Sequence, residues 1–125
     1  MLRALCRAKI HRITVTEARL DYEGSVTIDA ALLRAAGILP LEIVQITNLS
    51  NGTLWRTYAM AGAEGSGIFC LNGPPARLFH PGDLAIVLSH TYCAESEIGA
   101  LVQRTIFVDE HNRLLRVEEQ RPAAP

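Results

Sequence analysis

Several features that would assign a functional class are absent from the 125-residue sequence. Aromatic residues make up only 6%, and the apolar runs are too short for a membrane-spanning helix. Basic residues number 12 and acidic residues 13, so no charge excess attracts nucleic acid or an anionic membrane. The amino-terminal stretch interrupts its apolar residues with charge and lacks the apolar region of a signal peptide. We therefore expect a cytoplasmic protein that binds neither a membrane nor nucleic acid.

Patterns that bind metals or build common active sites are also missing. The cysteines Cys6, Cys70 and Cys93 are odd in number and unpaired in spacing, which predicts reduced thiols. The four histidines and three cysteines form no CxxC, HxxxH or HExxH pattern, so we expect no bound metal. The sequence contains no GxSxG elbow and no phosphate-binding loop that runs from a strand into a helix.

Apolar residues at 49% and charged residues at 20% predict a folded core, and the length fits one domain over residues 1–125. Short stretches rich in β-branched and apolar residues predict strands at 8–16, 26–28, 42–49, 54–61, 68–72, 84–89, 104–108 and 114–117. Many short strands with turns about every ten residues favour a mainly β fold, a compact closed barrel rather than an open sheet. We expect residues 119–125 to form a frayed tail.

Two local signals are specific enough to predict geometry. Asp29 is a suitable N-cap, and Gly37, followed by Pro40, is a suitable stop, so a helix is expected between them. Asn51-Gly52 predicts a hairpin with a type I′ turn, because both residues tolerate a positive φ.

The dipeptide Gly24-Ser25 has two readings. Taken alone it is an ordinary β-turn, as we also expect for the second Gly-Ser pair at 65–66. The residues around it favour a different interpretation, because they form a set of short motifs in a particular order and at particular separations. The set comprises Lys9-Ile-His-Arg12, Val15-Thr16, Tyr22-Glu-Gly-Ser25, Ile28-Asp29, Ala35-Ala-Gly-Ile-Leu39, Asn51-Gly52, Thr57-Tyr-Ala59, Asn72-Gly73 and Pro81-Gly-Asp-Leu84.

In these motifs the chain resembles the pyruvoyl-dependent aspartate 1-decarboxylases of bacteria. The resemblance covers roughly residues 1–90, and we find no match beyond them. It implies a small closed six-stranded double-psi β-barrel with one or two short helices. It also implies a homotetramer whose active sites lie between neighbouring subunits.

The resemblance further implies that the chain cuts itself between Gly24 and Ser25, giving chains 1–24 and 25–125. The Ser25 hydroxyl attacks the Gly24 carbonyl, and elimination and hydrolysis then leave a pyruvoyl group derived from Ser25. That group forms a Schiff base with L-aspartate and accepts electrons as CO2 leaves, without pyridoxal phosphate or metal. The product is β-alanine, used for pantothenate and coenzyme A. We expect Gly24 to allow a strained backbone that a Cβ would forbid.

Further site residues follow from the same resemblance. Tyr58 matches the proton donor, and Thr57 matches the residue that polarises the scissile carbonyl. Lys9 matches a cation for the substrate carboxylates, and Asn72 is expected to orient the reacting group. Without the resemblance, Thr57 and Tyr58 read as strand residues and Asn72 as a turn cap.

The sequence departs from the family pattern at two places. Leu54 stands where the family has an arginine, and Arg56, two residues along the same strand face, is the predicted substitute. Pro74-Pro75 follows Gly73 where the family has small residues with free amides. Substrate contacts at 73–75 must then use the Gly73 N–H, carbonyls or side chains.

Two alternatives remain open at this stage. Leu54 and the proline pair favour a barrel of the same fold that neither cleaves nor decarboxylates. The segment 33–46 also resembles part of transition-state-regulator DNA-binding proteins, although the near-neutral charge argues against a DNA-binding β-module.

Overall fold

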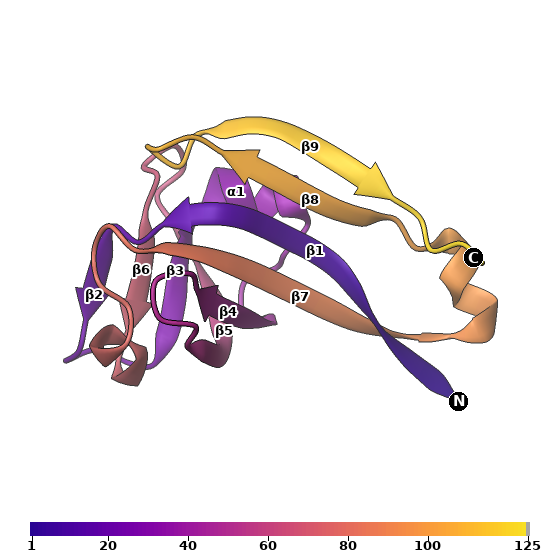
Figure 1. Ribbon diagram of the computed structural model, residues 1–125, viewed down its shortest axis with the longest axis horizontal. Coiled ribbons are helices and arrows are strands. Elements are labelled where there is room, and N and C mark those ends of the chain that lie inside the picture. The colour runs from indigo at the N-terminus through magenta and orange to yellow at the C-terminus, as the bar shows by residue number, and fades with distance from the viewer. Residues whose placement is uncertain (125) are drawn as a thin grey trace.

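The computed structural model describes residues 1–124, and strands dominate it (Figure 1). Pro125, the last residue of the predicted frayed tail, lies outside the described residues. Within the described range the helical elements are α1 (Ala30–Ala36) and the 3₁₀ turns η1 (Pro74–Arg77) and η2 (Glu95–Ala100). The strands are β1 (Leu2–Thr14), β2 (Glu17–Arg19), β3 (Ser25–Asp29), β4 (Ile43–Asn48), β5 (Leu54–Gly62), β6 (Phe69–Asn72), β7 (Leu84–Ala94), β8 (Gln103–Val108) and β9 (Leu114–Gln120).

The strands form one strongly curved sheet in the order β2-β6-β3-β5-β4-β7-β1-β8-β9. The prediction of a mainly β fold is confirmed. Over residues 1–124 the sheet has nine strands rather than six, and its outer strands β2 and β9 are not paired with each other. The connection after β1 instead joins the two halves, because Val15 N–H donates to Asp83 O and Thr16 N–H to Phe69 O. The result is barrel-like, without a continuous closing ladder.

The helix forms where the capping residues predict it. The Asp29 carboxylate accepts a hydrogen bond from Ala31 N–H at 2.9 Å, which satisfies one free donor of the first turn. Gly37 ends α1 in the left-handed conformation, with φ 75°. Leu32, Leu33 and Ala36 turn toward the core, so a seven-residue helix is held by its caps and by packing.

The hairpin between β4 and β5 exists, but the predicted type I′ turn is wrong. Gly52 has a φ of 74°, whereas Asn51 is not in the positive-φ region that a type I′ turn requires. The loop is longer, since Asn48 N–H pairs with Thr53 O and four residues lie between. Side chains hold it: Asn48 accepts from Ser50 N–H and Asn51 accepts from Thr53 N–H. These hydrogen bonds from backbone N–H groups to asparagine side chains stabilise the wider turn.

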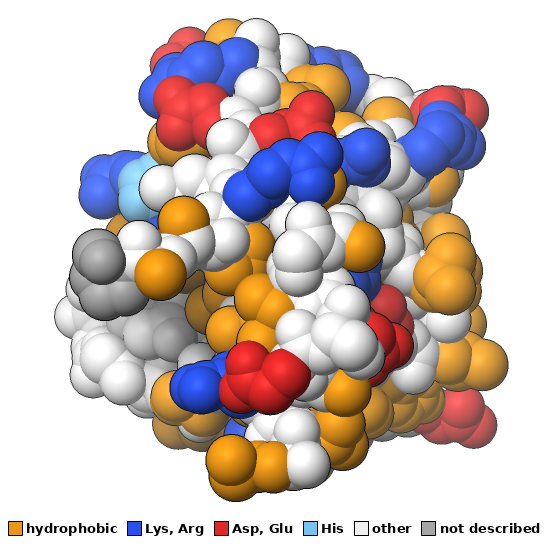
Figure 2. All heavy atoms as spheres, turned by 90° about the vertical axis from the view of Figure 1, so that its right-hand side faces the viewer, with side chains coloured by type: hydrophobic (Ala, Val, Ile, Leu, Met, Phe, Trp, Pro, Cys, Tyr) orange, Lys and Arg blue, Asp and Glu red, His pale blue; other side chains and the backbone are white. Residues whose placement is uncertain are grey.

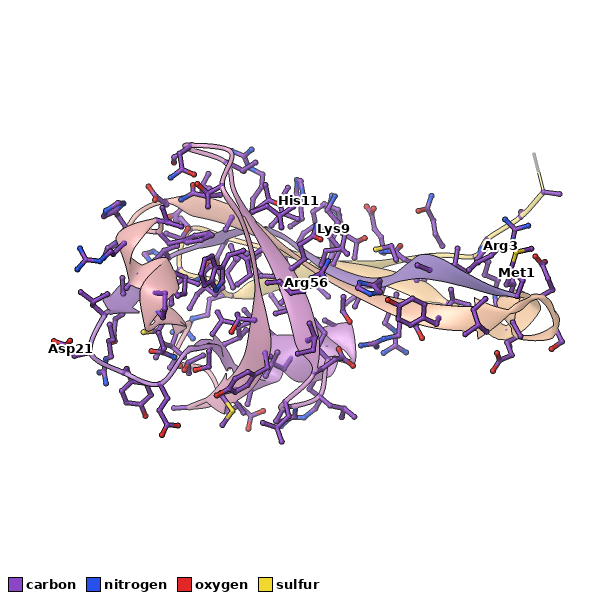
Figure 3. The ribbon with its side chains drawn as sticks, turned by 90° about the horizontal axis from the view of Figure 1, so that it is seen from below. Met1, Arg3, Lys9, His11, Asp21 and Arg56 are labelled. Atoms are coloured by element: carbon purple, nitrogen blue, oxygen red, sulfur yellow. The ribbon has the colours of Figure 1, made fainter. Side chains whose placement is uncertain are left out.

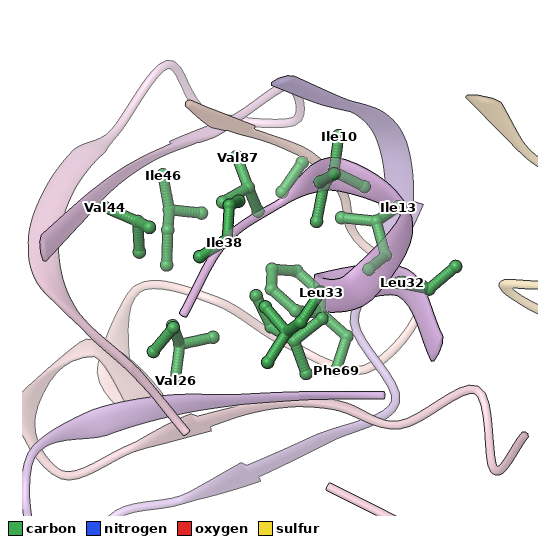
Figure 4. Packing of buried hydrophobic residues seen from close by; sticks show 14 of the residues in the cluster. Ile10, Ile13, Val26, Leu32, Leu33, Ile38, Val44, Ile46, Phe69 and Val87 are labelled. Atoms are coloured by element: carbon green, nitrogen blue, oxygen red, sulfur yellow. The ribbon is translucent and has the colours of Figure 1, made fainter. Parts of the chain in front are cut away.

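A single aliphatic core lies inside the curved sheet, with α1 across one opening (Figure 4). Alternate residues of β1, β4 and β7 point into it, including Ile10, Ile46 and Val87, each fully buried. Phe69 and Phe79 are the largest buried side chains. The core therefore relies on β-branched and leucine side chains, as the low aromatic content predicts.

The carboxy-terminal third is part of the fold. β8 pairs in parallel with β1 and antiparallel with β9, which confirms the predicted last hairpin and extends it to Gln120. Its turn is anchored by buried Asn112, whose amide donates to the carbonyls of Thr14 and Gly67 and accepts from Thr14 N–H. Gly67 must be glycine there, because a Cβ would lie 2.5 Å from His111 O.

The surface in Figure 2 mixes acidic and basic side chains with aliphatic ones, and no single sign dominates that face. Ion pairs such as Arg3–Glu95 account for part of the mixing. Among the residues that the structure describes, no helix combines the length and apolarity needed to cross a membrane.

Candidate active site

Ser25 is a buried serine at the first position of β3, directly after an exposed loop. Its side chain and backbone are only 3% exposed, whereas Tyr22, Glu23 and Gly24 before it are exposed. Asn72 Nδ2 donates to Ser25 Oγ at 3.0 Å, and the Ser25 hydroxyl faces Glu23 O at 3.4 Å. The Gly24–Ser25 bond thus joins an accessible loop to a fixed hydroxyl.

Three further polar side chains lie on the same face of β3 and β6 as Ser25. Asn72 Nδ2 also donates to Thr27 Oγ1 at 3.0 Å, and Cys70 Sγ donates to Asn72 Oδ1 at 3.2 Å. The antiparallel register pairs Ser25 with Asn72 and Thr27 with Cys70. Sequence reasoning missed Thr27 and Cys70. The spacing of two residues from Ser25 and Asn72 would have indicated them, because alternate strand residues share a face.

The prediction of a strained backbone at Gly24 is wrong. The strained glycine is Gly73. Gly24 is not among the residues with positive φ, and a Cβ on it would meet only Pro74 Cδ, at 3.9 Å. Gly73 has a φ of 80°, and a Cβ there would lie 3.0 Å from Gly24 Cα and 3.1 Å from Tyr22 O. Glycine at 73 therefore allows β6 to end directly against the loop that precedes Ser25.

The predicted use of the Gly73 N–H as a substrate donor conflicts with its place in the fold. That N–H donates to Arg19 O at 2.8 Å, so it is already engaged. Pro74 and Pro75 occupy the first positions of η1, where a missing N–H costs nothing. The segment 73–75 therefore has no free amide donor and forms a rigid wall beside Gly24.

Tyr58 and Thr57 lie on β5, next to β3. The parallel ladder pairs Val26 with Ala59, and continuing it backward puts Ser25 level with Tyr58 and Gly24 level with Thr57. Tyr58 and Thr57 are both half-buried and alternate between the two faces. Tyr58 thus shares the outer face with Ser25, while Thr57, level with Gly24, lies on the same face of β5 as buried Ala59.

The candidate cations occupy a row across the outer face. Lys9 pairs with Leu88, Leu88 with Gln45, and Gln45 with Arg56. Arg56 is exposed and shares its face with Leu54, which is 54% exposed, so the predicted same-face placement is confirmed. Within residues 1–124 neither Lys9 nor Arg56 joins an ion pair. Both cations are free to meet a carboxylate.

The potential around Lys9 is positive. His11 follows it on the same strand face, where burial and the charges of Lys9, Arg12 and Arg116 lower the pKa of the imidazole. The histidine is thereby kept neutral, and the surrounding cations favour an anion.

The structure does not bring Lys9 to Ser25 within one chain. Lys9 lies on β1, four strands away from Ser25 on β3 in the sheet order, a path of about 19 Å along the curved sheet at ~4.8 Å per strand. In Figure 3, Asp21, in the loop before Ser25, lies at the left end of the molecule, well apart from Lys9 and Arg56 near its middle.

Neither a metal cluster nor a disulfide is present in the part of the chain that the structure describes. No group of three histidine, cysteine or acidic residues is arranged to bind an ion. The three cysteines are free thiols. The donors gathered around Ser25 are amide, hydroxyl and thiol groups, which suit a carbonyl or hydroxyl rather than a metal.

Comparison with known proteins gives consistent matches. The family described as "Aspartate decarboxylase" matches residues 1–115. The Aspartate 1-decarboxylase of Geobacillus sp. (strain WCH70) is 47% identical over 123 residues, covering 98% of this chain and 97% of that protein. Those of Acetivibrio thermocellus and Legionella pneumophila are 45% and 46% identical over 96% and 95% of this chain, and 95% and 90% of their own lengths. The similarity continues past residue 90, where sequence reasoning found no further match.

Proposed function

Because the chain belongs to the aspartate decarboxylase family, we propose that it removes the C1 carboxyl group of L-aspartate. The products are β-alanine and CO2, and β-alanine is the building block for pantothenate. The observation that carries this proposal is the buried Ser25 hydroxyl, held by Asn72 at the end of an exposed loop.

The reactive group in this proposal is a pyruvoyl group made from Ser25 by self-cleavage after Gly24. It supplies an electron-accepting carbonyl to the amine of the substrate. A site lined by Asn72, Thr27 and Cys70 suits it, since the Asn72 amide donates at the Ser25 side chain. Ser25 stays fixed in the β3–β6 ladder after the cut, while the freed end at Gly24 belongs to the exposed loop.

The chain's own residues divide the remaining tasks. Thr57, level with Gly24, supports the scissile carbonyl with its hydroxyl, and Asn72 orients Ser25. Tyr58, level with Ser25 on the outer face, donates the proton that replaces the lost carboxyl group. Lys9 and Arg56 bind the substrate carboxylates, Arg56 in place of the arginine expected at position 54.

The active form is a homotetramer with sites between neighbouring copies. The separation of Lys9 from Ser25 by four strands of the sheet supports this assembly, because the two residues do not lie on neighbouring strands. A second copy that presents its β1 face to the loop end of the first removes that gap.

The two alternatives have less support. A non-catalytic barrel has no need for a buried serine with an amide directed at its hydroxyl, and Arg56 offers a cation where Leu54 does not. A DNA-binding module has an excess of basic residues, whereas this chain has 12 basic and 13 acidic residues, and the face in Figure 2 mixes both.

Intact mass spectrometry of the purified protein, combined with an assay for β-alanine, tests the proposal. We expect two chains, residues 1–24 and 25–125, the larger without a free amino terminus, and CO2 released in step with β-alanine. A Ser25→Ala variant is the matched control and stays uncut and inactive. A wild-type chain that remains whole and releases no CO2 after prolonged warming contradicts the proposal.

A further inference from the structure

We infer that Cys70 is a positioning residue for self-cleavage: its thiol fixes the Asn72 amide with the NH2 group directed at Ser25. This inference rests on the proposed function and assigns a role to a residue that the sequence left as an ordinary buried thiol. The contacts that carry it join four side chains on one face of β3 and β6.

Two contacts distinguish the two possible orientations of the Asn72 amide. One is the Cys70 thiol on its oxygen. The other is the Ser25 hydroxyl, which donates to Glu23 O at 3.4 Å and so accepts from the amide nitrogen. The hydroxyl of Thr27 donates or accepts, so it pairs equally well with an amide nitrogen or an amide oxygen. A thiol is a weak donor and a weak acceptor, and in this structure the Cys70 thiol donates. Cys70 Sγ lies 3.2 Å from Asn72 Oδ1, and this bond leaves Nδ2 for Ser25 and Thr27, both at 3.0 Å.

The thiol stays protonated and therefore remains a donor. Burial is the main cause that raises the pKa of Cys70, and the negative charge of Glu17 adds to it, while Arg19 partly opposes the shift. Glu17 and Arg19 border a hollow of about 170 Å³ beside Cys70, Asn72 and Thr27. Cys70 itself is only 2% exposed.

The orientation matters for the first step of the cut. Ser25 Oγ forms a bond to the Gly24 carbonyl carbon, the bond from that carbon to Ser25 N breaks, and the hydroxyl proton ends on that nitrogen. The step yields an ester and an amine without any co-reactant. Negative charge develops on Oγ as its proton leaves and passes to the Gly24 carbonyl oxygen as the new C–O bond forms. An N–H donor held 3.0 Å from Oγ stabilises the first of these two states. An amide oxygen in that place repels the same charge.

The test compares cleavage rates of freshly synthesised precursor by intact mass spectrometry. Cys70→Ser keeps a donor and is expected to cleave within about twofold of wild type, whereas Cys70→Ala and Cys70→Val are slowed about fivefold or more. Cys93→Ala removes another buried cysteine, on β7 away from the site, and is the matched control with an unchanged rate. Thermal unfolding of each precursor identifies any variant that does not fold. Cys70→Ala and Cys70→Val differ in side-chain volume, so if one of them fails to fold, the other still provides the test.

The outcomes separate this inference from the proposed function. If the wild-type precursor never cleaves, the proposed function fails. If the wild type cleaves and a folded Cys70→Ala or Cys70→Val variant cleaves at the same rate, the positioning role of the thiol is overturned. It is also overturned if Cys70→Ser cleaves as slowly as Cys70→Ala.

Discussion

Leu54 and Arg56 lie two residues apart on the exposed face of β5, so a cation moved between these positions still projects from the same surface. We predict that Arg56→Ala raises the KM for aspartate by about 10- to 100-fold, the range expected for loss of a charged hydrogen bond. Self-cleavage is expected to continue at its normal rate, because Arg56 makes no contact with Ser25 or Asn72 within the described chain. Steady-state kinetics at a series of aspartate concentrations measure the effect.

A paired exchange provides the control for Arg56. Leu54→Ala removes an exposed apolar neighbour and should leave KM unchanged. Restoring a cation at the other position, with Leu54→Arg added to Arg56→Leu, should recover most of the affinity if the two sites reach the same carboxylate. An unchanged KM in Arg56→Ala removes this arginine from the substrate site.

Gly73 is the residue whose missing side chain shapes the cleavage loop. Gly73→Ala puts a Cβ 3.0 Å from Gly24 Cα and 3.1 Å from Tyr22 O, which pushes the loop away from its present course. We predict that cleavage slows by at least about tenfold, since the scissile bond loses its alignment with Ser25 Oγ. Time-resolved mass spectrometry of the precursor gives the rate.

Gly52→Ala is a control for the general effect of an alanine at a positive φ. Gly52 has a φ of 74°, close to the 80° of Gly73, but a Cβ there has no atom within 4 Å. Both variants carry the cost of an alanine at positive φ, and Gly73→Ala carries more of it, because φ 80° with ψ −141° lies close to a region that essentially only glycine adopts. Equal cleavage rates in the two would mean that the contact between residue 73 and the loop does not matter.

At the scale of secondary-structure elements, the Asp29 carboxylate at the end of β3 connects that strand to α1 and to the loop before β6. It caps α1 through Ala31 N–H and also accepts from the N–H groups of Gly65 and Gly67, at 3.0 and 2.8 Å. Burial raises the pKa of this carboxyl, but the three backbone donors and the charge of Arg113 outweigh it, and the net shift is downward. A lowered pKa in the folded state means that the stabilisation is complete above the unfolded pKa, near ~3.9, and is lost as pH falls through the folded value.

We therefore predict that Asp29→Asn lowers the free energy of unfolding by about 1–2 kcal/mol at pH 7. The difference from wild type should shrink as the pH falls below ~4, because the wild-type carboxyl is then neutralised as well. Urea unfolding in a Ser25→Ala background, at one protein concentration, measures it on a single uncut chain. A difference that stays constant down to pH 2 would show that the charge of Asp29 is irrelevant to stability.

The sequence correctly predicted those elements whose conformation depends on residues only a few positions away. Asp29 and Gly37 bound the helix as expected, because a cap depends on its own few neighbours. The Asn51-Gly52 turn was wrong because Asn48, outside the dipeptide, holds a wider loop. β7 was predicted to end at residue 89 but runs to Ala94, since its pairing with the start of β1 supplies a partner that no local pattern reveals.

The site divides in the same way. Ser25, Asn72 and Tyr58 were predicted by resemblance, and their roles stay predictions; the register puts Ser25 opposite Asn72 and level with Tyr58. Cys70 and Thr27 escaped notice because a thiol and a hydroxyl on strands read as fillers until the register pairs them. Backbone strain was predicted at Gly24 but lies at Gly73, which packs directly against Gly24. Only the packing of β6 against the loop distinguishes the two glycines.

At the scale of the whole molecule, the curvature of the sheet separates residues that chemistry needs together. Lys9, Arg56 and Ser25 all lie on the outer, convex side, where side chains diverge rather than converge. Arg56 and Tyr58 share a strand and belong to one patch, but Lys9 is three strands from Arg56, about 14 Å at ~4.8 Å per strand. If a second copy supplies Lys9 to the site, as the proposed homotetramer requires, assembly and activity should be inseparable.

Hybrid assemblies test that link directly. Lys9→Ala and Tyr58→Phe each remove one functional group, and each variant alone should be cleaved but nearly inactive. When both are co-expressed and purified together through different tags, a site that takes Lys9 from one copy and Tyr58 from its neighbour is intact in about a quarter of random pairings. We predict that the hybrid recovers about that fraction of wild-type kcat, while each variant co-expressed with itself recovers none. If each chain supplies both residues to its own site, every site carries one defect, and the hybrid stays as inactive as its parents.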